Sequence, residues 1–461
     1  MTFKKLIGAC LAALAVTVFV ADPALAQAAA PKIDKGDTTW MMVATIVVLF
    51  MTVPGLALFY GGLVRSKNML SMLMQVFYAV VIAYVIWFIY GYSLAFTGGS
   101  DFIGGFHKAF LARVTPESPG GTFSVGVAIP ELVFVAFQAT FAGITAALLL
   151  GSFAERTKFA AVALFIPLWL TFVYFPMAHM VWYWAGPDAV DAAAKALAAA
   201  TDAAAKTKAQ AALDAVNADA GFIFKLGALD FAGGTVVHIN SGLTGLIGAL
   251  IVGKRLGYGK ELMPPHSLVM TYIGAAMLWF GWFGFNAGSN LEATGSAITA
   301  LMNTLFCPAA AALSWLFAEW LTKGKPSLLG AVSGLVAGLV AVTPAAGFSG
   351  LGGAVVLGLV AGVVCYFFCT VVKNTFKYDD TLDVFGIHAV GGIVGAIGTG
   401  ILAAPSLGGS GVFDYTTGKV GDFDMAAQVW SQTQGVLVTV VWVGVVSTIL
   451  FYIVKLIVGL R

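Results

Sequence analysis

The sequence predicts an all-α polytopic membrane protein with eleven transmembrane helices, in which helices 1–5 and 6–10 form an inverted repeat. Composition is the first reason: 60% of the 461 residues are hydrophobic and 10% are charged, whereas soluble domains carry about 25% charged residues. Eleven apolar stretches also approach the roughly 20 residues that a helix needs to cross a bilayer. Two of these stretches repeat each other around a histidine. The net charge of +2 indicates neither nucleic-acid binding nor a basic membrane-surface patch.

The N-terminus has the pattern of a cleaved signal peptide. Lys4 and Lys5 precede an apolar core over residues 6–20, and a small-x-small site ends at Ala26. The alternative is a first transmembrane helix, but the apolar core is short for crossing a bilayer. We therefore expect cleavage after Ala26 and a mature membrane domain over residues 27–461.

The eleven predicted spans define the order of the membrane domain. They begin near Trp40, Met69, Glu131, Lys158, Leu229, His266, Ala297, Leu328, Leu351, Val384 and Val436. Basic residues concentrate in the turns after odd-numbered spans, which places those turns on the cytoplasmic side. These residues are Arg65, Lys67, Arg156, Lys158, Lys254, Arg255, Lys260, Lys323, Lys325, Lys373 and Lys377. The prediction is an inner-membrane protein with its N-terminus outside and its C-terminus inside.

One outer loop is longer and of different composition. Residues 188–220 are rich in Ala and are interrupted by Asp and Lys too often for a membrane span. High Ala content favours a helix, so we expect an exposed helix in an extracytoplasmic insertion.

The cysteines do not suggest a metal or cofactor site. Cys307, Cys365 and Cys369 all lie in apolar spans, without neighbouring ligands at helical spacing. Packing as small hydrophobic side chains is the interpretation that fits them. We expect neither a metal nor a cofactor.

The histidine repeat is the most informative pattern. From Asp230 the chain reads DFAGGTVVHINSGLTGLIG, and from Asp380 it reads DTLDVFGIHAVGGIVGAIG. Each histidine, His238 or His388, follows its Asp by eight residues, and glycines follow it at +4, +7 and +10. The fifth span enters from outside and the tenth from inside, and eight helical residues rise about 12 Å. Both imidazoles should therefore reach similar depth near the bilayer midplane, where closely packed helices could let them touch.

Each feature of this repeat also has a plain structural interpretation. A single buried histidine can be satisfied by a backbone carbonyl, but two at matched depth favour a functional role. A metal pair would need a third ligand, and none stands beside them at helical spacing. Asp230 and Asp380 are suited to capping the first turns of their helices. Asp230 precedes an unusual FAGG, so it could in addition fix the local backbone or the electrostatics of a nearby site.

Five long segments carry a family resemblance: PGLALFYGGLVRSKN (54–68), FAGITAALLLGSFAERTKF (141–159), DFAGGTVVHINSG (230–242), WFGFNAGSN (282–290) and DDTLDVFGIHAVGGIVGAIGTG (379–400). They resemble the ammonium transporter family (Amt/MEP/Rh), in particular its bacterial Amt branch. This resemblance implies a homotrimer in which each subunit has its own narrow, mostly apolar pore. Bacterial members usually have a cytoplasmic tail that helps to dock a PII signal protein. This sequence stops at Arg461, so either it is shortened or the protein lacks that mode of control, and PII is not an expected partner.

The resemblance assigns roles to individual positions along one pore. An outer recruitment site would use Phe141, Trp182 and Ser289, with Asp230 as the acidic residue required near it. Phe141 and Phe285 would stack to close the pore, and His238 and His388 would line it below. Trp282 and Thr343 fall where family members place further pore-lining residues.

These roles imply ammonium recruitment outside, deprotonation near Phe141, and passage of ammonia past the histidines, with associated proton movement. Aromatic faces attract a small cation, whereas an apolar pore opposes a bare ion. Methylammonium is an expected alternative substrate. A neutral ammonia gas channel and an ammonium sensor remain open as alternatives. A membrane enzyme using the histidines as acid and base is not favoured, since no nucleophile, metal cluster or cofactor motif accompanies them.

Overall fold

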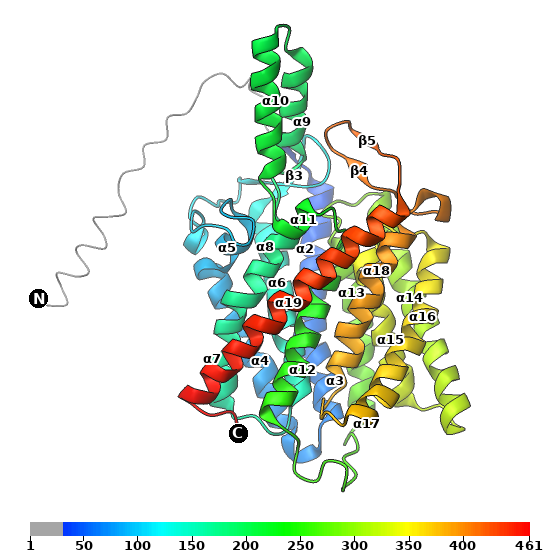
Figure 1. Ribbon diagram of the computed structural model, residues 1–461. Helices are drawn as coiled ribbons and strands as arrows, with labels where there is room; N and C mark the ends of the chain where they lie inside the picture. The colour runs from blue at the N-terminus through cyan, green and yellow to red at the C-terminus, as the bar shows by residue number, and fades with distance from the viewer. Residues whose placement is uncertain (1–30) are drawn as a thin grey trace, which may run out of the picture. The chain divides into compact units, whose positions relative to one another are not determined.

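The computed structural model describes residues 31–461, and the predicted signal peptide lies outside the described residues. Among the described residues, eleven helical segments are long and apolar enough to cross a membrane, as predicted. Together they form one bundle (Figure 1). Span one comprises α2 (Lys35–Phe50), η1 (Met51–Leu56) and α3 (Ala57–Leu63), and span two comprises η2 (Ser66–Asn68), α4 (Met69–Ile86), η3 (Trp87–Gly91) and α5 (Tyr92–Phe96). Span three comprises α6 (Glu131–Leu148) and η5 (Leu149–Phe153), and span four comprises α7 (Phe159–Trp169), η6 (Leu170–Tyr174) and α8 (Phe175–Trp182). Span five comprises η7 (Gly234–Ile239) and α12 (Asn240–Val252).

Three of the five pairs of related spans share their irregular turns. Spans three and eight both end in a 3-10 turn, spans four and nine both contain a π turn, and spans five and ten both begin with a π turn. Spans one and two contain π turns that spans six and seven lack. The turns shared by the three pairs support the predicted inverted repeat. The remaining spans comprise α13 (Leu268–Gly288); α14 (Gly295–Lys323); α15 (Leu328–Val342) and η8 (Thr343–Ala345); α16 (Leu351–Phe367), η9 (Phe368–Val372) and α17 (Lys373–Phe376); η10 (Phe385–Ala389) and α18 (Val390–Leu402); and α19 (Met425–Ile457).

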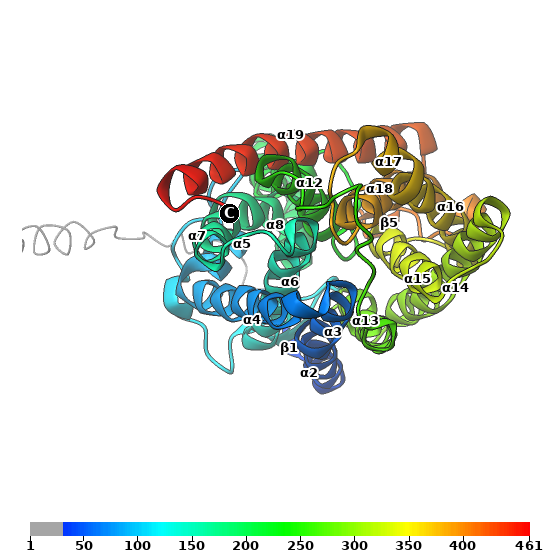
Figure 2. The same cartoon turned by 90° about the horizontal axis from the view of Figure 1, so that it is seen from below.

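The eleventh span begins earlier than predicted. α19 starts at Met425 rather than near Val436, and the side chain of Asp424 caps it by accepting from the backbone N–H of Ala427. Its 33 residues span about 50 Å, so the helix runs obliquely along one side of the bundle, against α7, α12 and α18 (Figures 1 and 2). Polar residues in its first turns hid this start. One of them, Gln432, is buried, and its amide nitrogen donates hydrogen bonds to the backbone carbonyls of Leu229 and Ala396 at 2.8 Å.

The outer insertion also differs from the prediction of a single helix. It forms a hairpin of two helices, α9 (Pro187–Ala199) and α10 (Ala203–Ala218), because Asp202 caps a new helix after a break in the first. Val190, Ala193 and Leu213 form a small core between them. Short elements complete the face of the bundle that carries this hairpin: β1 (Lys32–Ile33), η4 (Ala109–Leu111), β2 (Pro119–Gly121), β3 (Val127–Pro130), α11 (Phe222–Lys225), η11 (Pro405–Leu407), β4 (Phe413–Asp414) and β5 (Lys419–Val420).

The helices that carry the two histidines touch through glycine. A Cβ placed on Gly242 of α12 would lie 2.3 Å from the backbone nitrogen of Ala389, closer than any real contact. One placed on Gly392 of α18 would lie 2.9 Å from the carbonyl oxygen of Gly234. The predicted close approach of spans five and ten is therefore confirmed.

Candidate functional site

The two histidines of the repeat form a buried pair. Their Nδ1 atoms are 3.2 Å apart and their ring centroids 5.3 Å apart, and the residues are 1% and 4% exposed. His238 comes from η7 and His388 from η10, the π turns that open spans five and ten. An uncharged pair can form this hydrogen bond only if one Nδ1 carries a proton and the other does not. The pair therefore holds two opposite tautomers in contact.

The route from each Asp to its histidine is only partly helical. Residues 230–233 form a turn, in which Gly233 has a φ of 111°, and the helix starts at Gly234. In span ten, residues 381–383 likewise precede the helix, so the assumption of eight helical residues was wrong for both spans. The contact still forms because spans five and ten begin in equivalent π turns.

The carboxylate of Asp230 holds this turn. It accepts hydrogen bonds from the backbone N–H groups of Gly233, Gly234 and Thr235 at 2.6–2.8 Å, and from the hydroxyl of Thr235. Its backbone carbonyl accepts the indole N–H of Trp182 at 3.0 Å. Asp380 similarly accepts from the backbone N–H of Phe385 at 2.8 Å. Both aspartates therefore cap their helices, and Asp230 also positions Trp182.

A continuous column of rings leads from Trp182 to the histidines. Trp182 meets Phe141 edge-on with centroids 5.8 Å apart, and Phe141 stacks on Phe285 at 4.2 Å. The ring centroids of Phe285 and His238 are 6.1 Å apart, and His238 contacts His388. Neither phenylalanine has any exposed surface. The five residues carried over from the family pattern are thus brought into one line.

Trp282 and Thr343 support this column from the side. The indole of Trp282 stacks on His238 with centroids 5.4 Å apart, and it donates its N–H to the hydroxyl of Thr343 at 2.9 Å. That hydroxyl donates in turn to the carbonyl of Leu339 at 2.8 Å. The chain of hydrogen bonds fixes the plane of the indole and therefore the face that it presents to His238.

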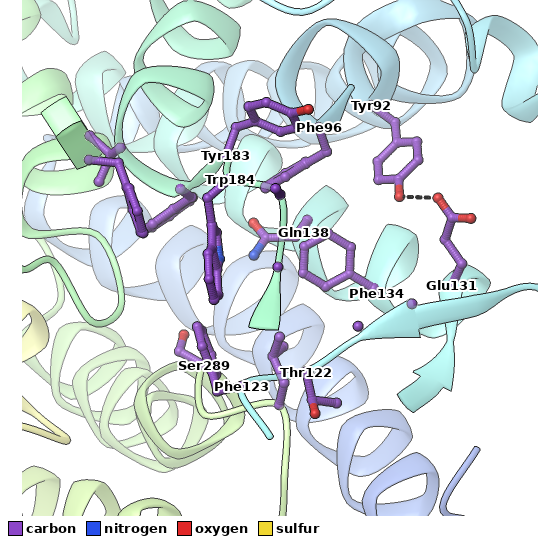
Figure 3. A pocket seen from close by; sticks show the side chains of 18 of the residues that line it. Tyr92, Phe96, Thr122, Phe123, Glu131, Phe134, Gln138, Tyr183, Trp184 and Ser289 are labelled. Carbon is purple, nitrogen blue, oxygen red and sulfur yellow. Dashed lines mark hydrogen bonds between the residues drawn. The ribbon is translucent and has the colours of Figure 1, made fainter. Parts of the chain in front are cut away.

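At the Trp182 end of the column, on the side of the bundle that carries the α9–α10 hairpin, lies a cavity of about 300 Å³, called the outer cavity below. Trp182 and Ser289 both line it, and Figure 3 shows Ser289 at its edge. The hydroxyl of Ser289 donates to the carbonyl of Phe285 at 2.8 Å, so its oxygen remains an acceptor for a ligand. The lining residues do not include Phe141, which lies buried below, or Asp230, whose carboxylate is used by the turn. A neighbouring cavity of about 640 Å³ is bounded in part by the α9–α10 hairpin.

Several residues of the outer cavity were not predicted from the sequence. Glu131, Phe134, Gln138 and Phe141 are spaced by three, four and three residues, so they share one face of α6. All except Phe141 line the cavity. That spacing was the signal that could have found them. Lys108 and Tyr92 also line the cavity but come from other segments, and their proximity has no local sequence pattern.

An ion network joins the turns at the opposite end of the bundle. Glu155 accepts from the backbone and side chain of Arg65 at 2.7 and 2.9 Å and from Arg255 at 3.1 Å. Arg255 also contacts Asp379 at 2.8 Å. Burial opposes the charged form of Glu155, but the hydrogen bonds from the two arginines outweigh it and lower its pKa to about 2. Arg65 and Arg255, which served above only to predict the membrane orientation, thus also link the ends of neighbouring helices.

Comparison with known proteins agrees with this geometry. The model of the Ammonium Transporter Family matches residues 39–461. A relative named an ammonium transporter from Aquifex aeolicus is 44% identical over 436 residues, covering 95% of this chain and 91% of the relative. One from Bacillus subtilis is 41% identical over 428 residues, covering 93% and 94%. The crystal structure of Saccharomyces cerevisiae Mep2 matches with a TM-score of 0.77 and 33% identity, covering 93% of this chain and 90% of that one.

Proposed function

The chain belongs to the ammonium transporter family, and from this premise we propose that it recruits ammonium at the outer cavity, removes a proton there, and conducts ammonia past the two phenylalanines and the two histidines. The relatives are named as transporters, and the eleven apolar helices belong to an integral membrane protein. The observation that carries the proposal is the unbroken ring column from Trp182 through Phe141 and Phe285 to the histidine pair.

Recruitment depends on the upper end of the column. Trp182 offers an aromatic face to a cation, which gains about 0.5–2 kcal/mol per contact depending on how far water is excluded. Ser289 offers an oxygen lone pair, since its proton is engaged by Phe285. Asp230 acts through the turn and through Trp182 rather than by direct contact.

The phenylalanine pair separates ions from neutral molecules. Both rings are fully buried and stack at 4.2 Å, so an ion passing between them would lose its water without a polar replacement. Potassium cannot avoid this loss. Ammonium can, because it releases a proton and crosses the dry region as ammonia.

The histidines then receive a polar but uncharged molecule. Among residues 31–461, Nε2 of His238 is buried without a hydrogen-bond partner, so it is available to ammonia. The Nδ1 contact with His388 links the two rings. A proton added to one ring can shift to the other through this contact, which makes the pair suitable as a relay.

We also propose the assembly and orientation that the family resemblance implies. The protein would be a homotrimer in the cell's inner membrane, with its N-terminus outside and its C-terminus inside. The cluster of basic residues in the turns after odd-numbered spans supports this orientation. The outer cavity then faces the extracytoplasmic side and the Glu155 network faces the cytoplasm.

The test is the current that an ammonium gradient drives through reconstituted protein. We expect wild-type proteoliposomes to give an ammonium-evoked current, and the variant Trp182→Leu to need at least about fivefold more ammonium for half-saturation. Trp430→Leu is the control, since Trp430 is an exposed aromatic on α19 outside the column. Uptake without current would favour the neutral gas channel, and neither uptake nor current would favour the sensor.

A further inference from the structure

A buried carboxylate in the outer cavity already holds an ammonium group that belongs to the chain. Glu131, 6% exposed, accepts hydrogen bonds from the hydroxyl of Tyr92 and from the amine of Lys108. The Lys108 nitrogen also lies 5.9 Å from the centroid of the Tyr92 ring. Figure 3 shows the Tyr92–Glu131 bond at one side of the cavity and Ser289 at another. All these residues line the same space.

These three groups have the chemistry of a receptor for a primary ammonium ion. A carboxylate gives a charge-assisted hydrogen bond to N–H donors, and an aromatic face attracts a cation. The lysine amine is itself a primary ammonium with three donors. Its position therefore shows how a small alkylammonium would be held.

We propose that Glu131 and Tyr92 form a second ammonium subsite in the outer cavity, and that Lys108 is its built-in occupant, which free ammonium or methylammonium displaces. The delivery of this ion to the pore rests on the proposed function, but its binding does not. The subsite would lie on the approach to Trp182 and would make recruitment a competition between a free cation and a tethered one.

The lysine side chain can leave without releasing its loop. The backbone N–H of Lys108 donates to the hydroxyl of Ser93 at 2.9 Å, and that hydroxyl donates to the carbonyl of Gly105 at 2.7 Å. The Lys108 side chain is 34% exposed, so its amine is close to water. The Glu131 side chain is only 7% exposed and gains little from water when the amine leaves. Replacement by another cation is therefore the favourable way to vacate the subsite.

Tethering sets the strength of this competition. A group on a short flexible stem acts at an effective concentration of about a millimolar or more. Free ammonium well below that level would seldom displace it. Removing the amine while keeping the carboxylate should therefore tighten binding of small ammonium ions in the cavity.

The experiment is calorimetric titration of the detergent-solubilised full chain with methylammonium chloride, with sodium chloride as the salt control. We expect Lys108→Met to lower the methylammonium dissociation constant about fivefold, because the competing Lys108 amine is partly exposed and such an ion pair contributes modestly. Adding Glu131→Gln to that variant should abolish this gain in methylammonium affinity, and adding Tyr92→Phe should reduce the gain. Lys195→Met is the matched control: it removes one charge from the outer insertion, at a side chain that is 75% exposed.

The alternative is a static ion pair that fastens residues 97–118 to α6. In that case Lys108→Met would lower the melting temperature and bind methylammonium like Lys195→Met, which overturns the proposal. Retention of the gain in Lys108→Met with Glu131→Gln would overturn it too. If Glu131→Gln does not fold, the Tyr92→Phe combination decides. Currents recorded in parallel separate the two proposals, because their absence in the wild type would refute transport while calorimetry still decides the subsite.

Discussion

The indole N–H of Trp182 donates to the backbone carbonyl of Asp230, 3.0 Å away, while the carboxylate of the same aspartate holds the three backbone N–H groups that open span five. One residue therefore sets both the position of the recruiting aromatic ring and the start of the helix that carries His238. Loss of that carboxylate should impair recruitment without any direct contact to the ion.

Asp230→Asn should reduce the ammonium-evoked current at least about tenfold. The amide can accept fewer of the four hydrogen bonds, and each buried group left unpaired costs about 1–3 kcal/mol. Currents from proteoliposomes at matched protein density are the measurement. Asp191→Asn is the control, because Asp191 forms an ion pair with exposed Lys195 on the α9–α10 hairpin, away from the column. Equal currents from both variants would contradict the positioning role of Asp230.

Gly242→Ala should separate the two histidine-bearing helices. The added methyl group would lie 2.3 Å from the nitrogen of Ala389, so the backbones must move apart, and we expect about 1–3 kcal/mol of destabilisation together with loss of current. Gly444→Ala in α19 is the matched control, since its Cβ would meet nothing within 4 Å. Thermal unfolding in detergent and the current are measured for both. Similar behaviour of the two variants would show that the glycine contact is not needed.

Phe285→Ala should weaken the exclusion of ions. The variant removes one ring of the stacked pair and leaves a space that water can enter, so potassium should begin to conduct. Phe280→Ala on the same helix is the control, because Phe280 is 55% exposed on the surface of the bundle whereas Phe285 is fully buried. The measurement is current in a potassium gradient without ammonium. An unchanged potassium barrier in Phe285→Ala would argue against the phenylalanine gate.

Glu155→Gln should lower the stability of the protein at neutral pH and weaken the decrease in stability as the pH falls. The pKa of Glu155 is lowered from 4.5 to about 2 in the folded protein. Its stabilising contribution is therefore complete above about pH 4.5 and is lost as the pH falls towards 2. Melting temperatures between pH 7 and pH 3 test this, with the exposed Glu117→Gln as control. A parallel pH profile for wild type and Glu155→Gln would contradict the role of the network.

The spans and the histidine contact could be predicted from the sequence because both depend on local patterns. Hydropathy marks each crossing, and the Asp–His–Gly repeat marks two equivalent helices. The start of α19 was missed because Gln432 is a buried polar residue whose partners, Leu229 and Ala396, are distant in sequence. The turn after Asp230 was missed because hydropathy does not distinguish a glycine turn from a helix. Lys108 and Glu131 meet only through tertiary folding.

The histidine pair gives the most direct test of the transport scheme. Ammonium and potassium currents should be compared in wild type, His238→Ala, His388→Ala and the control His266→Ala, whose ring bonds the carbonyl of Val64 in a turn outside the spans. We expect each pore variant to lose most ammonium current or to begin to pass potassium, while His266→Ala matches wild type. Unchanged ammonium current together with unchanged potassium exclusion in both pore variants would contradict it.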